Sequence, residues 1–173
     1  LNELIQQILT LASLTNEDPR MAFNEFDLTK MIRSIIDDAN FEAQHLPSTI
    51  TFDCPSSCNI NANFSLIQSA IENVVRNALN YSEKDQPLKL SLALKEKNIN
   101  ITIEDTGPGI AEDMLPHIFE PFFRTDDSRT SSTGGFGLGL AIAKKAILLH
   151  RGTIKAYNVP TGGLGVNIFL PQQ

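Results

Sequence analysis

The chain has 173 residues, of which 42% are hydrophobic, and it carries 14 Lys and Arg against 20 Asp and Glu, for a formal charge of -6. This composition fits one domain with a real core plus an appended segment, rather than two independent domains. The net negative charge argues against nucleic acid as a partner bound by electrostatic attraction to the whole surface. No apolar run reaches the roughly 18 to 20 residues that span a bilayer, and no basic-then-apolar leader opens the chain.

The sequence starts at Leu1 rather than at Met, so we interpret it as a soluble fragment. Any membrane or targeting segment would then belong to missing parts of the parent protein. Two cysteines stand in the run Cys54-Pro-Ser-Ser-Cys58, but the histidines lie far apart and form no ligand cluster with them. Zinc would need two more ligands at compatible spacing, so we expect structural thiols in a reducing cytosol.

The first predicted element is a helix over residues 1–14, where apolar residues recur at alternating steps of three and four. The turn-formers and proline of Asn16–Pro19 stop this helix. We therefore expect residues 1–20 to be the end of a longer hairpin helix plus a linker, and residues 21–173 to be the domain proper, beginning near Phe23.

Two amphipathic helices with a strand between them are predicted next. Asp27 or Thr29 can cap a helix whose inward side carries Leu28, Met31, Ile32, Ile35 and Ile36. Residues 50–52 form a short strand in this prediction. The second helix spans residues 64–81 and turns seven apolar residues inward: Leu66, Ile67, Ala70, Ile71, Val74, Val75 and Ala78.

The remaining elements are mostly strands. Apolar residues alternate over 88–94 and again over 99–103, which predicts a hairpin joined at residues 95–98. Residues 111–135 form an irregular stretch that is long enough to be a mobile lid. A helix over 140–149 and two strands, 152–156 and 165–170, complete the chain, with a turn at Pro160–Gly163.

Glycines at 134, 135, 137 and 139 lead directly into the helix over 140–149. Glycines in this place let the backbone approach an anion and aim its N–H groups and the positive end of the helix dipole at a phosphate. The spacing matches neither a P-loop nor the dinucleotide fingerprint G-x-G-x-x-G. A phosphate site and a flexible or tightly packed helix start are both open interpretations.

Two further motifs carry polar side chains. Asp105-Thr106-Gly107-Pro108-Gly109-Ile110 follows a predicted strand and is either a plain tight turn or a pocket in which Asp105 accepts a hydrogen bond from an exocyclic amine. In the second interpretation, this pocket would select adenine over guanine. Asn73 and Asn77 lie four residues apart on one helix face, so they either ligate a hard cation such as Mg²⁺ or are solvated or capping asparagines.

These motifs, in this order, resemble those of sensor histidine kinases. Residues 72–82 resemble the N box, residues 105–110 the first glycine box, residues 119–124 the F box and residues 135–140 the second glycine box. Residues 161–165 match the third glycine box more weakly. The resemblance covers about residues 70–170, and its style is similar to envelope-stress sensor kinases of Gram-negative bacteria.

The resemblance implies the Bergerat ATP-binding fold, an α/β (α+β) two-layer sandwich with a mixed, mostly antiparallel sheet, helices on one face and a flexible ATP lid. It implies a catalytic domain that uses ATP and Mg²⁺ and transfers the γ-phosphate to a histidine on an upstream dimerisation domain. A response regulator receiver domain would then take the phosphate on an aspartate. The parent would be a homodimer of an inner-membrane sensor, with this domain in the cytoplasm.

The resemblance also implies residue roles. Asp105 would bind the adenine amino group, Tyr81 would flank the ring, and Asn77 would be the metal ligand, with Asn73 beside the phosphates. The implied catalytic residues are Asn73, Asn77 and Arg124. The implied nucleotide-binding residues are Asn73, Asn77, Tyr81, Asp105, Gly107, Gly109, Ile110, Phe123, Arg124, Gly135, Gly137, Leu138, Gly139 and Leu140.

The F box would anchor the lid through Phe119, Phe122 and Phe123. Arg124, with Arg129 as a second candidate, would neutralise charge on the transferred phosphoryl group. Solvated lid arginines are the alternative interpretation.

Two positions depart from the family pattern. Asn80 stands where many members carry Lys or Arg, which puts one phosphate contact in doubt, and Val166 stands where the third glycine box carries Ser or Thr. A nucleotide-binding regulatory module without transfer activity is one alternative, and Asn80 is its support. ATP hydrolases of the gyrase, chaperone and mismatch-repair kind are another, but they carry a glutamate where this chain has Asn73. An amide cannot act as a general base toward water, which favours transfer to histidine.

The phosphoacceptor is expected outside this chain, because none of His45, His117 and His150 is followed by an acidic residue and then by Arg and Pro. His150 is expected to end its helix beside the negative end of the dipole. We therefore predict that the purified chain does not phosphorylate itself when incubated with labelled ATP. An acid-labile phosphohistidine formed on it would refute this.

Overall fold

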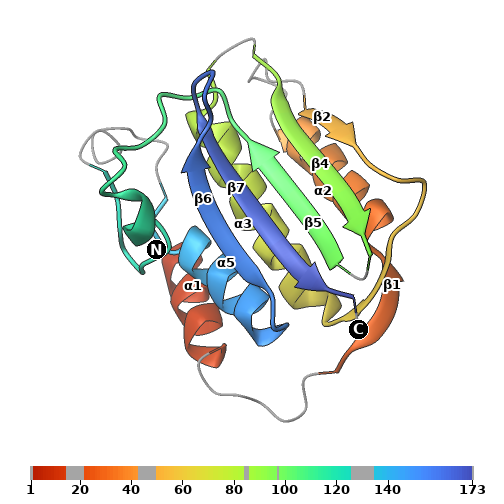
Figure 1. Cartoon of the computed structure of the whole chain (residues 1–173). Coiled ribbons are helices and arrows are strands. Elements are labelled where there is room, and N and C mark those ends of the chain that lie inside the picture. Colours follow the sequence, from red (N-terminus) through yellow and green to blue (C-terminus); the bar gives the residue numbers. More distant parts are fainter. Residues whose placement is uncertain are drawn as a thin grey trace.

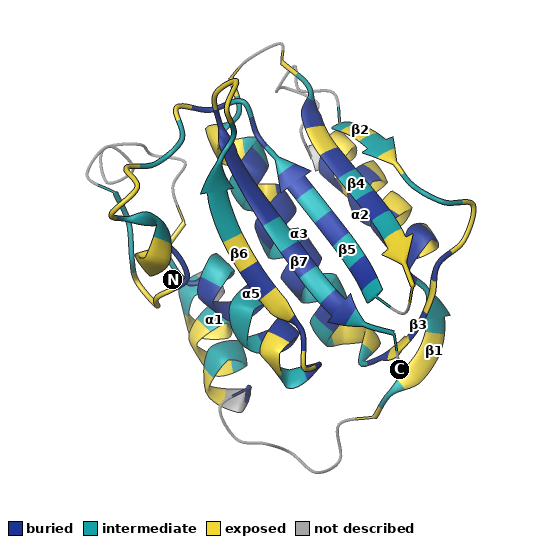
Figure 2. Cartoon of the chain, in the orientation of Figure 1, coloured by how far each residue is buried: buried dark blue, intermediate teal, exposed yellow. Residues whose placement is uncertain are grey.

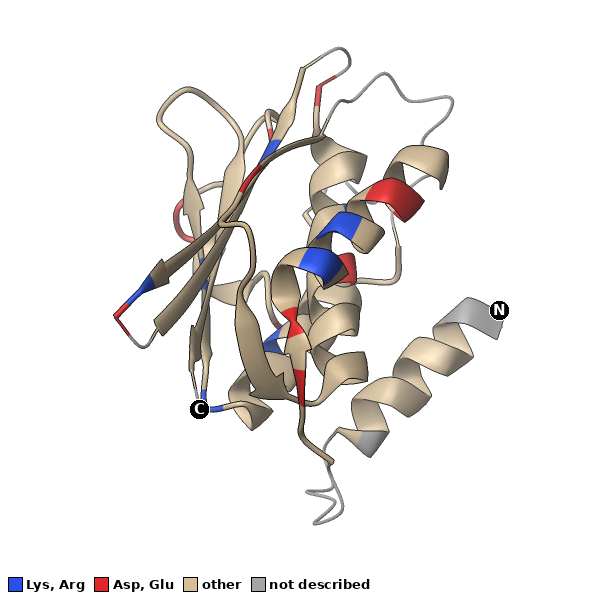
Figure 3. Cartoon of the chain, turned by 90° about the vertical axis from the view of Figure 1, so that its right-hand side faces the viewer, with Lys and Arg blue, Asp and Glu red and all other residues tan. Residues whose placement is uncertain are grey.

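The chain folds into two layers, a sheet and a set of helices on one face of it (Figures 1 and 3). A computed structural model describes residues 2–14, 22–42, 50–83, 86–96, 98–125 and 135–172. The main sheet has the strand order β2-β4-β5-β7-β6, with β2 parallel to β4 and the other neighbouring pairs antiparallel. Its strands are β2 (Ile50–Asp53), β4 (Leu88–Lys95), β5 (Asn98–Glu104), β6 (Thr153–Asn158) and β7 (Leu164–Pro171). This arrangement confirms the predicted α/β two-layer fold.

Three helices cover one face of the main sheet, and α1 lies outside them against α5 (Figure 1). The helices are α1 (Asn2–Ser13), α2 (Leu28–Glu42), α3 (Phe64–Tyr81) and α5 (Gly139–Leu149), with a short 3₁₀ turn η1 (Leu115–His117). Two short strands, β1 (Asn24–Asp27) and β3 (Asn59–Ala62), form a separate antiparallel pair. No helix in the described ranges is long and apolar enough to cross a membrane.

A single main core fills the space between the sheet and α2, α3 and α5, where Figure 2 shows the buried residues. Alternate residues of β4 and β5 point into it because side chains of a strand face opposite sides in turn. The six inward residues of the two strands are Leu88, Leu90, Leu92, Ile99, Ile101 and Ile103, each at most 3% exposed. The predicted hairpin and the predicted inward face of α3 are thereby confirmed, except that Leu66 is only half-buried.

The starts of α2 and α3 are fixed by side-chain caps. Asp27 Oδ1 accepts hydrogen bonds from the backbone N–H of Thr29 (3.0 Å) and of Cys58 (3.2 Å), so Asp27 is the cap of α2. Asn63 Oδ1 accepts from the backbone N–H of Leu66 (3.1 Å) at the start of α3. The bond to Cys58 also ties α2 to β3, so one carboxylate joins two elements that the sequence had not connected.

The cysteines are free thiols, half-buried at Cys54 and buried at Cys58. Burial, and next the charge of Asp27, raise the pKa of the Cys58 thiol, so it stays protonated at neutral pH. Among the described residues no group of three or more His, Cys, Asp or Glu could hold a metal ion.

α1 has two apolar sides. Leu14, just after α1, packs with Leu138, just before α5, and with Ile142 of α5, and the half-buried Leu4 and Leu11 join this smaller cluster. On the other side of α1, three apolar side chains are 43% to 63% exposed: Ile5, Ile8 and Leu9. The helix predicted over residues 1–14 is confirmed, while the linker predicted at residues 15–20 lies outside the described residues.

His150 joins the end of α5 to the start of α3. Its Nδ1 lies 2.7 Å from the carbonyl oxygen of Ala146, and its Nε2 lies 3.0 Å from the backbone nitrogen of Asn63, which donates to it. These partners require the neutral tautomer, with the proton on Nδ1. The ring also stacks on Phe23 at 5.1 Å. His150 ends its helix as predicted, and burial lowers its pKa.

We expect His150 to make folding sensitive to acid. Its folded-state pKa lies below the ordinary value of 6.5, so the unfolded chain takes up the proton first as the pH falls. The stability that neutral His150 contributes is therefore complete above pH 6.5 and is lost progressively below it. Between neutral and mildly acidic pH, the free energy of unfolding measured by urea titration should fall in the wild type. In His150→Gln this fall should be about 1 kcal/mol smaller.

The matched control is His117→Gln, because the His117 side chain is 52% exposed and lies at the surface beside Glu120. This control also removes one imidazole, but an exposed one, so a difference between the two variants reports on burial at position 150. Equal pH dependence in His150→Gln and wild type would contradict the role given to the buried imidazole.

Candidate functional site

The loop formed by residues 105–110 packs against the C-terminal end of α3. The backbone N–H of Glu83 donates to Thr106 Oγ1 at 3.2 Å. A Cβ atom at Gly107 would collide with the carbonyl oxygen of Tyr81, so only glycine allows this approach. The first glycine box and the end of the N box, separate in sequence, are therefore in direct contact.

Asp105 is the buried polar group of this loop, with 4% of its surface exposed. Its Oδ1 accepts hydrogen bonds from the backbone N–H of Gly107 and of Leu164, both at 2.9 Å. Burial raises the pKa of this carboxyl group, and the two backbone bonds partly offset that rise. The hydrogen bond from the Gly107 N–H closes the motif into a tight turn. In this turn Oδ2 is the carboxylate oxygen that can accept a hydrogen bond from a ligand.

Asn73, Asn77 and Tyr81 follow one another at intervals of four along α3 and share one face of the helix. Asn73 Nδ2 donates to the carbonyl oxygen of Ser69 at 2.8 Å. The half-buried side chain of Asn77 makes no hydrogen bond within the described part of the chain. Tyr81, one turn later, is 38% exposed. Within the described part of the chain, the amide oxygen of Asn77 is therefore open to a ligand, one turn after the hydrogen-bonded Asn73.

The start of α5 faces Asn73. A Cβ atom at Gly139 would lie 2.8 Å from Asn73 Oδ1, which shows how closely the two helices approach there. Leu138 precedes the helix, is fully buried and provides no side-chain cap. The first N–H groups of α5 therefore have no capping side chain, which is the arrangement that favours an anion at a helix N-terminus.

The F box joins the second glycine box through the backbone. Phe122 N–H donates to the carbonyl oxygen of Gly137 at 2.8 Å, and Gly137 has a φ of +73°. Phe119 is buried, with Lys144 Nζ 5.8 Å from its ring centroid, and Phe123 is half-buried. The Phe122 ring is 62% exposed, so it does not anchor this segment by burial as the sequence suggested.

The remaining predicted site residues divide into described and undescribed ones. Arg124 is half-buried at the end of the described lid segment, and Gly135 begins the next described segment with no atom within 4 Å of a Cβ built on it. Leu140 is half-buried in the first turn of α5. Arg129 and Gly134 lie outside the described residues.

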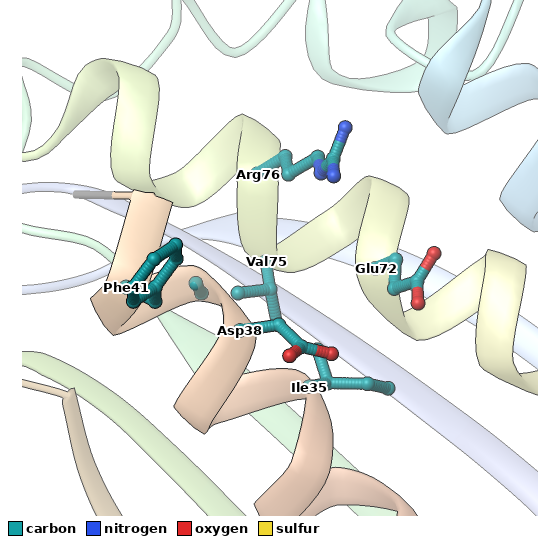
Figure 4. Close-up of a pocket in the computed structure, with 7 residues that line it drawn as sticks. Ile35, Asp38, Phe41, Glu72, Val75 and Arg76 are labelled. Carbon is teal, nitrogen blue, oxygen red and sulfur yellow. The ribbon is translucent and has the colours of Figure 1, made fainter.

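Two hollows flank α3. One is bordered by residues of α1, α3 and α5 and reaches Asn73. The other lies between α2 and α3 and includes none of the predicted site residues; its lining is Ile35, Asp38, Ala39, Phe41, Glu72, Val75 and Arg76 (Figure 4). Glu72 lines both hollows and accepts a hydrogen bond from Gln68 Nε2 at 2.8 Å.

Sequence reasoning missed Asn158, whose carboxamide bonds to both backbone groups of Ile110. Residue type gave no signal for it, because an asparagine at the end of a strand usually indicates a turn.

Comparison with known proteins identifies the arrangement. A family model described as "Histidine kinase-, DNA gyrase B-, and HSP90-like ATPase" matches residues 62–173. Sensor histidine kinase CpxA of Escherichia coli K12 is 36% identical over 172 residues, covering 99% of this chain and 37% of that protein. Sensor-like histidine kinase SenX3 of Mycobacterium tuberculosis H37Rv is 30% identical over 171 residues, covering 99% and 42%. The chain spans less than half the length of these relatives.

Solved structures agree on the fold. The Acinetobacter baumannii histidine kinase AdeS superposes with a TM-score of 0.80 at 25% identity, over 99% of this chain and 78% of that one. The nucleotide-free catalytic domain of histidine kinase ThkA gives a TM-score of 0.78 at 25% identity, over 88% of this chain and 97% of that one.

We predict that Gly163 and Gly162 respond unequally to alanine. Both have positive φ, +101° and +104°, so both variants bear the strain of a Cβ atom in that region. At Gly163 the Cβ would also collide with the carbonyl oxygen of Asp105, whereas at Gly162 its nearest neighbour, the Gly107 carbonyl oxygen, lies 4.0 Å away. Gly163→Ala should therefore lower the free energy of unfolding by about 2 kcal/mol more than Gly162→Ala in urea titrations. Equal losses would mean that the turn yields without disturbing Asp105.

Proposed function

Since the chain belongs to the histidine kinase-, DNA gyrase B- and HSP90-like ATPase family, we propose that it is the ATP-binding catalytic domain of a two-component sensor histidine kinase. The γ-phosphate of ATP would pass to a histidine on the parent's dimerisation domain and then to an aspartate of a response regulator receiver domain. One observation carries the proposal: the buried Asp105 turn, the Asn73–Tyr81 face of α3 and the uncapped start of α5 converge around the C-terminal half of one helix.

Asp105 supports adenine as the base. Two backbone donors fix its Oδ1, which leaves Oδ2 to accept a hydrogen bond from an exocyclic amino group. Guanine presents a carbonyl oxygen at the corresponding ring position, which a carboxylate repels. Tyr81 lies one turn beyond Asn77 and is exposed enough to flank a ring. The nucleotide would thus be selected by its base on the sheet side of the site.

The residues present fit a magnesium ion shared with phosphates. Asn77 offers an oxygen that no group among the described residues occupies, and the same residues contain no carboxylate cluster that would hold the ion without a nucleotide. The ion would neutralise phosphate charge when bound. Gly135, Gly137, Gly139 and the N–H groups after them would receive the phosphates at the start of α5.

The polar face of α3 supports transfer over hydrolysis. Asn73 holds its amide against the carbonyl oxygen of Ser69, and an amide cannot take a proton from water. Glu72, the nearest carboxylate in sequence, is hydrogen-bonded to Gln68 and borders both hollows beside α3. The positive charge near the transferred phosphoryl group would then come from Arg124.

The relatives are named as sensors, which supports placing this domain on the cytoplasmic side of an inner-membrane homodimer. The membrane segment would lie in the parent outside these residues.

We predict that Asp105→Asn abolishes adenine recognition while the loop keeps its shape. The asparagine oxygen can still accept from Gly107 and Leu164, but its amide nitrogen would face the adenine amino group, donor against donor. Calorimetric titration with a non-hydrolysable ATP analogue and Mg²⁺ should show an increase in Kd of at least about tenfold. Wild-type titration without Mg²⁺ should show weaker binding.

Glu104→Gln is the matched control, because Glu104 is the adjacent carboxylate and its Oε1 instead accepts a bond from the Tyr157 hydroxyl at 2.7 Å. This control should bind as the wild type does. Unchanged affinity in Asp105→Asn would contradict the proposed adenine contact.

Transfer itself is tested in the full-length parent with labelled ATP. We expect label on a histidine outside this chain. Binding without labelling would favour a regulatory module, and steady phosphate release by the isolated chain would favour an ATP hydrolase.

A further inference from the structure

The third glycine box has no role in the proposed site, although the structure places it beside the Asp105–Ile110 loop. The box forms the turn between β6 and β7, in which Asn158 and Leu164 are paired across the two strands. Val159 N–H donates to the carbonyl oxygen of Gly163 at 2.9 Å and closes the turn. The two residues at the base of this turn are therefore held at a fixed separation.

These two residues form hydrogen bonds with opposite ends of the Asp105–Ile110 loop. At one end, the backbone N–H of Leu164 donates to Asp105 Oδ1 at 2.9 Å, and the backbone N–H of Asp105 donates to the Leu164 carbonyl at 3.0 Å. At the other end, Asn158 Oδ1 accepts from the backbone N–H of Ile110 at 2.9 Å, and Asn158 Nδ2 donates to the Ile110 carbonyl at 2.7 Å.

The Asn158 contact replaces a strand partner. Ile110 lies beyond the end of β5, so neither of its backbone groups takes part in the sheet. The carboxamide of Asn158 satisfies both at once, as a neighbouring strand would. A Cβ atom at Gly109 would lie 2.8 Å from Asn158 Oδ1, and Gly109 has a φ of +73°, so this glycine makes the close approach possible.

We propose that Asn158 is a positioning residue that holds the Asp105–Ile110 loop ready for the adenine base and so sets nucleotide affinity through the loop. The inference rests on the proposed function, because the loop's contact with adenine belongs to that proposal. A loop fixed before binding loses less conformational entropy when the ligand arrives. The turn of the third glycine box then stabilises the Asp105–Ile110 loop through Asn158 and Leu164, the two residues at the base of the turn.

The test compares Asn158→Ala with Asn158→Asp by titration of the ATP analogue and Mg²⁺. Alanine removes both bonds to Ile110 and should raise Kd about tenfold at unchanged stoichiometry. Aspartate keeps the acceptor for the Ile110 N–H but sets its second carboxylate oxygen against the Ile110 carbonyl oxygen, two acceptors in contact, so it should also raise Kd. An irreversibly misfolded fraction would lower the stoichiometry and leave Kd unchanged, whereas reversible unfolding would raise the apparent Kd and would be seen as a lower free energy of unfolding in urea titration. If the alanine variant does not fold, the aspartate variant decides, and a Kd equal to the wild type would then overturn the proposal.

Asn167→Ala is the control, since Asn167 Nδ2 donates to Thr102 Oγ1 at 3.0 Å on the same sheet, away from the loop. It should bind as the wild type does. Amide hydrogen exchange supplies a local readout: exchange at Ile110 should accelerate in Asn158→Ala, while Gly107, held by Asp105, stays protected. Wild-type affinity in Asn158→Ala, or unchanged exchange at Ile110, would overturn this inference alone. Absence of binding by the wild type would overturn the proposed function as well.

Discussion

The site depends on one buried carboxylate. Asp105 gives up most of its hydration, and an ion in that position is costly unless protein donors replace the lost water. Two backbone N–H groups do so, from Gly107 within the turn and from Leu164 at the start of β7. Because those donors come from separate segments, the carboxylate stays in place only when the turn and the β6–β7 connection are both formed. Charge burial therefore links the local turn to the assembled sheet.

The same carboxylate explains why so many glycines surround it. Gly107 lies against the Tyr81 carbonyl and Gly163 against the Asp105 carbonyl, and a side chain at either position would force these backbones apart. Gly107 and Gly163 thus serve close backbone packing around Asp105 rather than flexibility. Gly135 is different, since a Cβ atom there would meet nothing within 4 Å, whereas one at Gly137 would lie 2.7 Å from the Phe123 carbonyl oxygen.

Sequence patterns predicted the long elements well, because periodic burial extends over many residues. The bounds of α3 match the prediction for residues 64–81, where apolar residues recur through a whole amphipathic helix. The strands β1 and β3 were missed, since each has four residues and a pattern that short carries little information. The partner of β2 was equally unpredictable, because it pairs in parallel with a strand that comes much later in the sequence.

Within the site, residue types indicated Asp105, Asn73 and Asn77, but they could not indicate which protein atoms each would contact. The Asn158 side chain binds the backbone groups of Ile110, 48 positions away in the sequence. Every residue has such backbone groups, so no sequence motif indicates the contact. The difference between the buried Phe119 and the exposed Phe122 likewise arises from tertiary packing, since both belong to one aromatic motif.

His150 fixes one end of α5. The imidazole fastens the last turn of this helix to the start of α3, so a tilt of α5 would pivot near that end. The opposite end carries Gly139, and near that end Ile142 packs in one cluster with Leu4 and Leu11 of α1. A displacement of α1 would thus act far from the fixed end, and Gly139 would move further than the last turn of the helix.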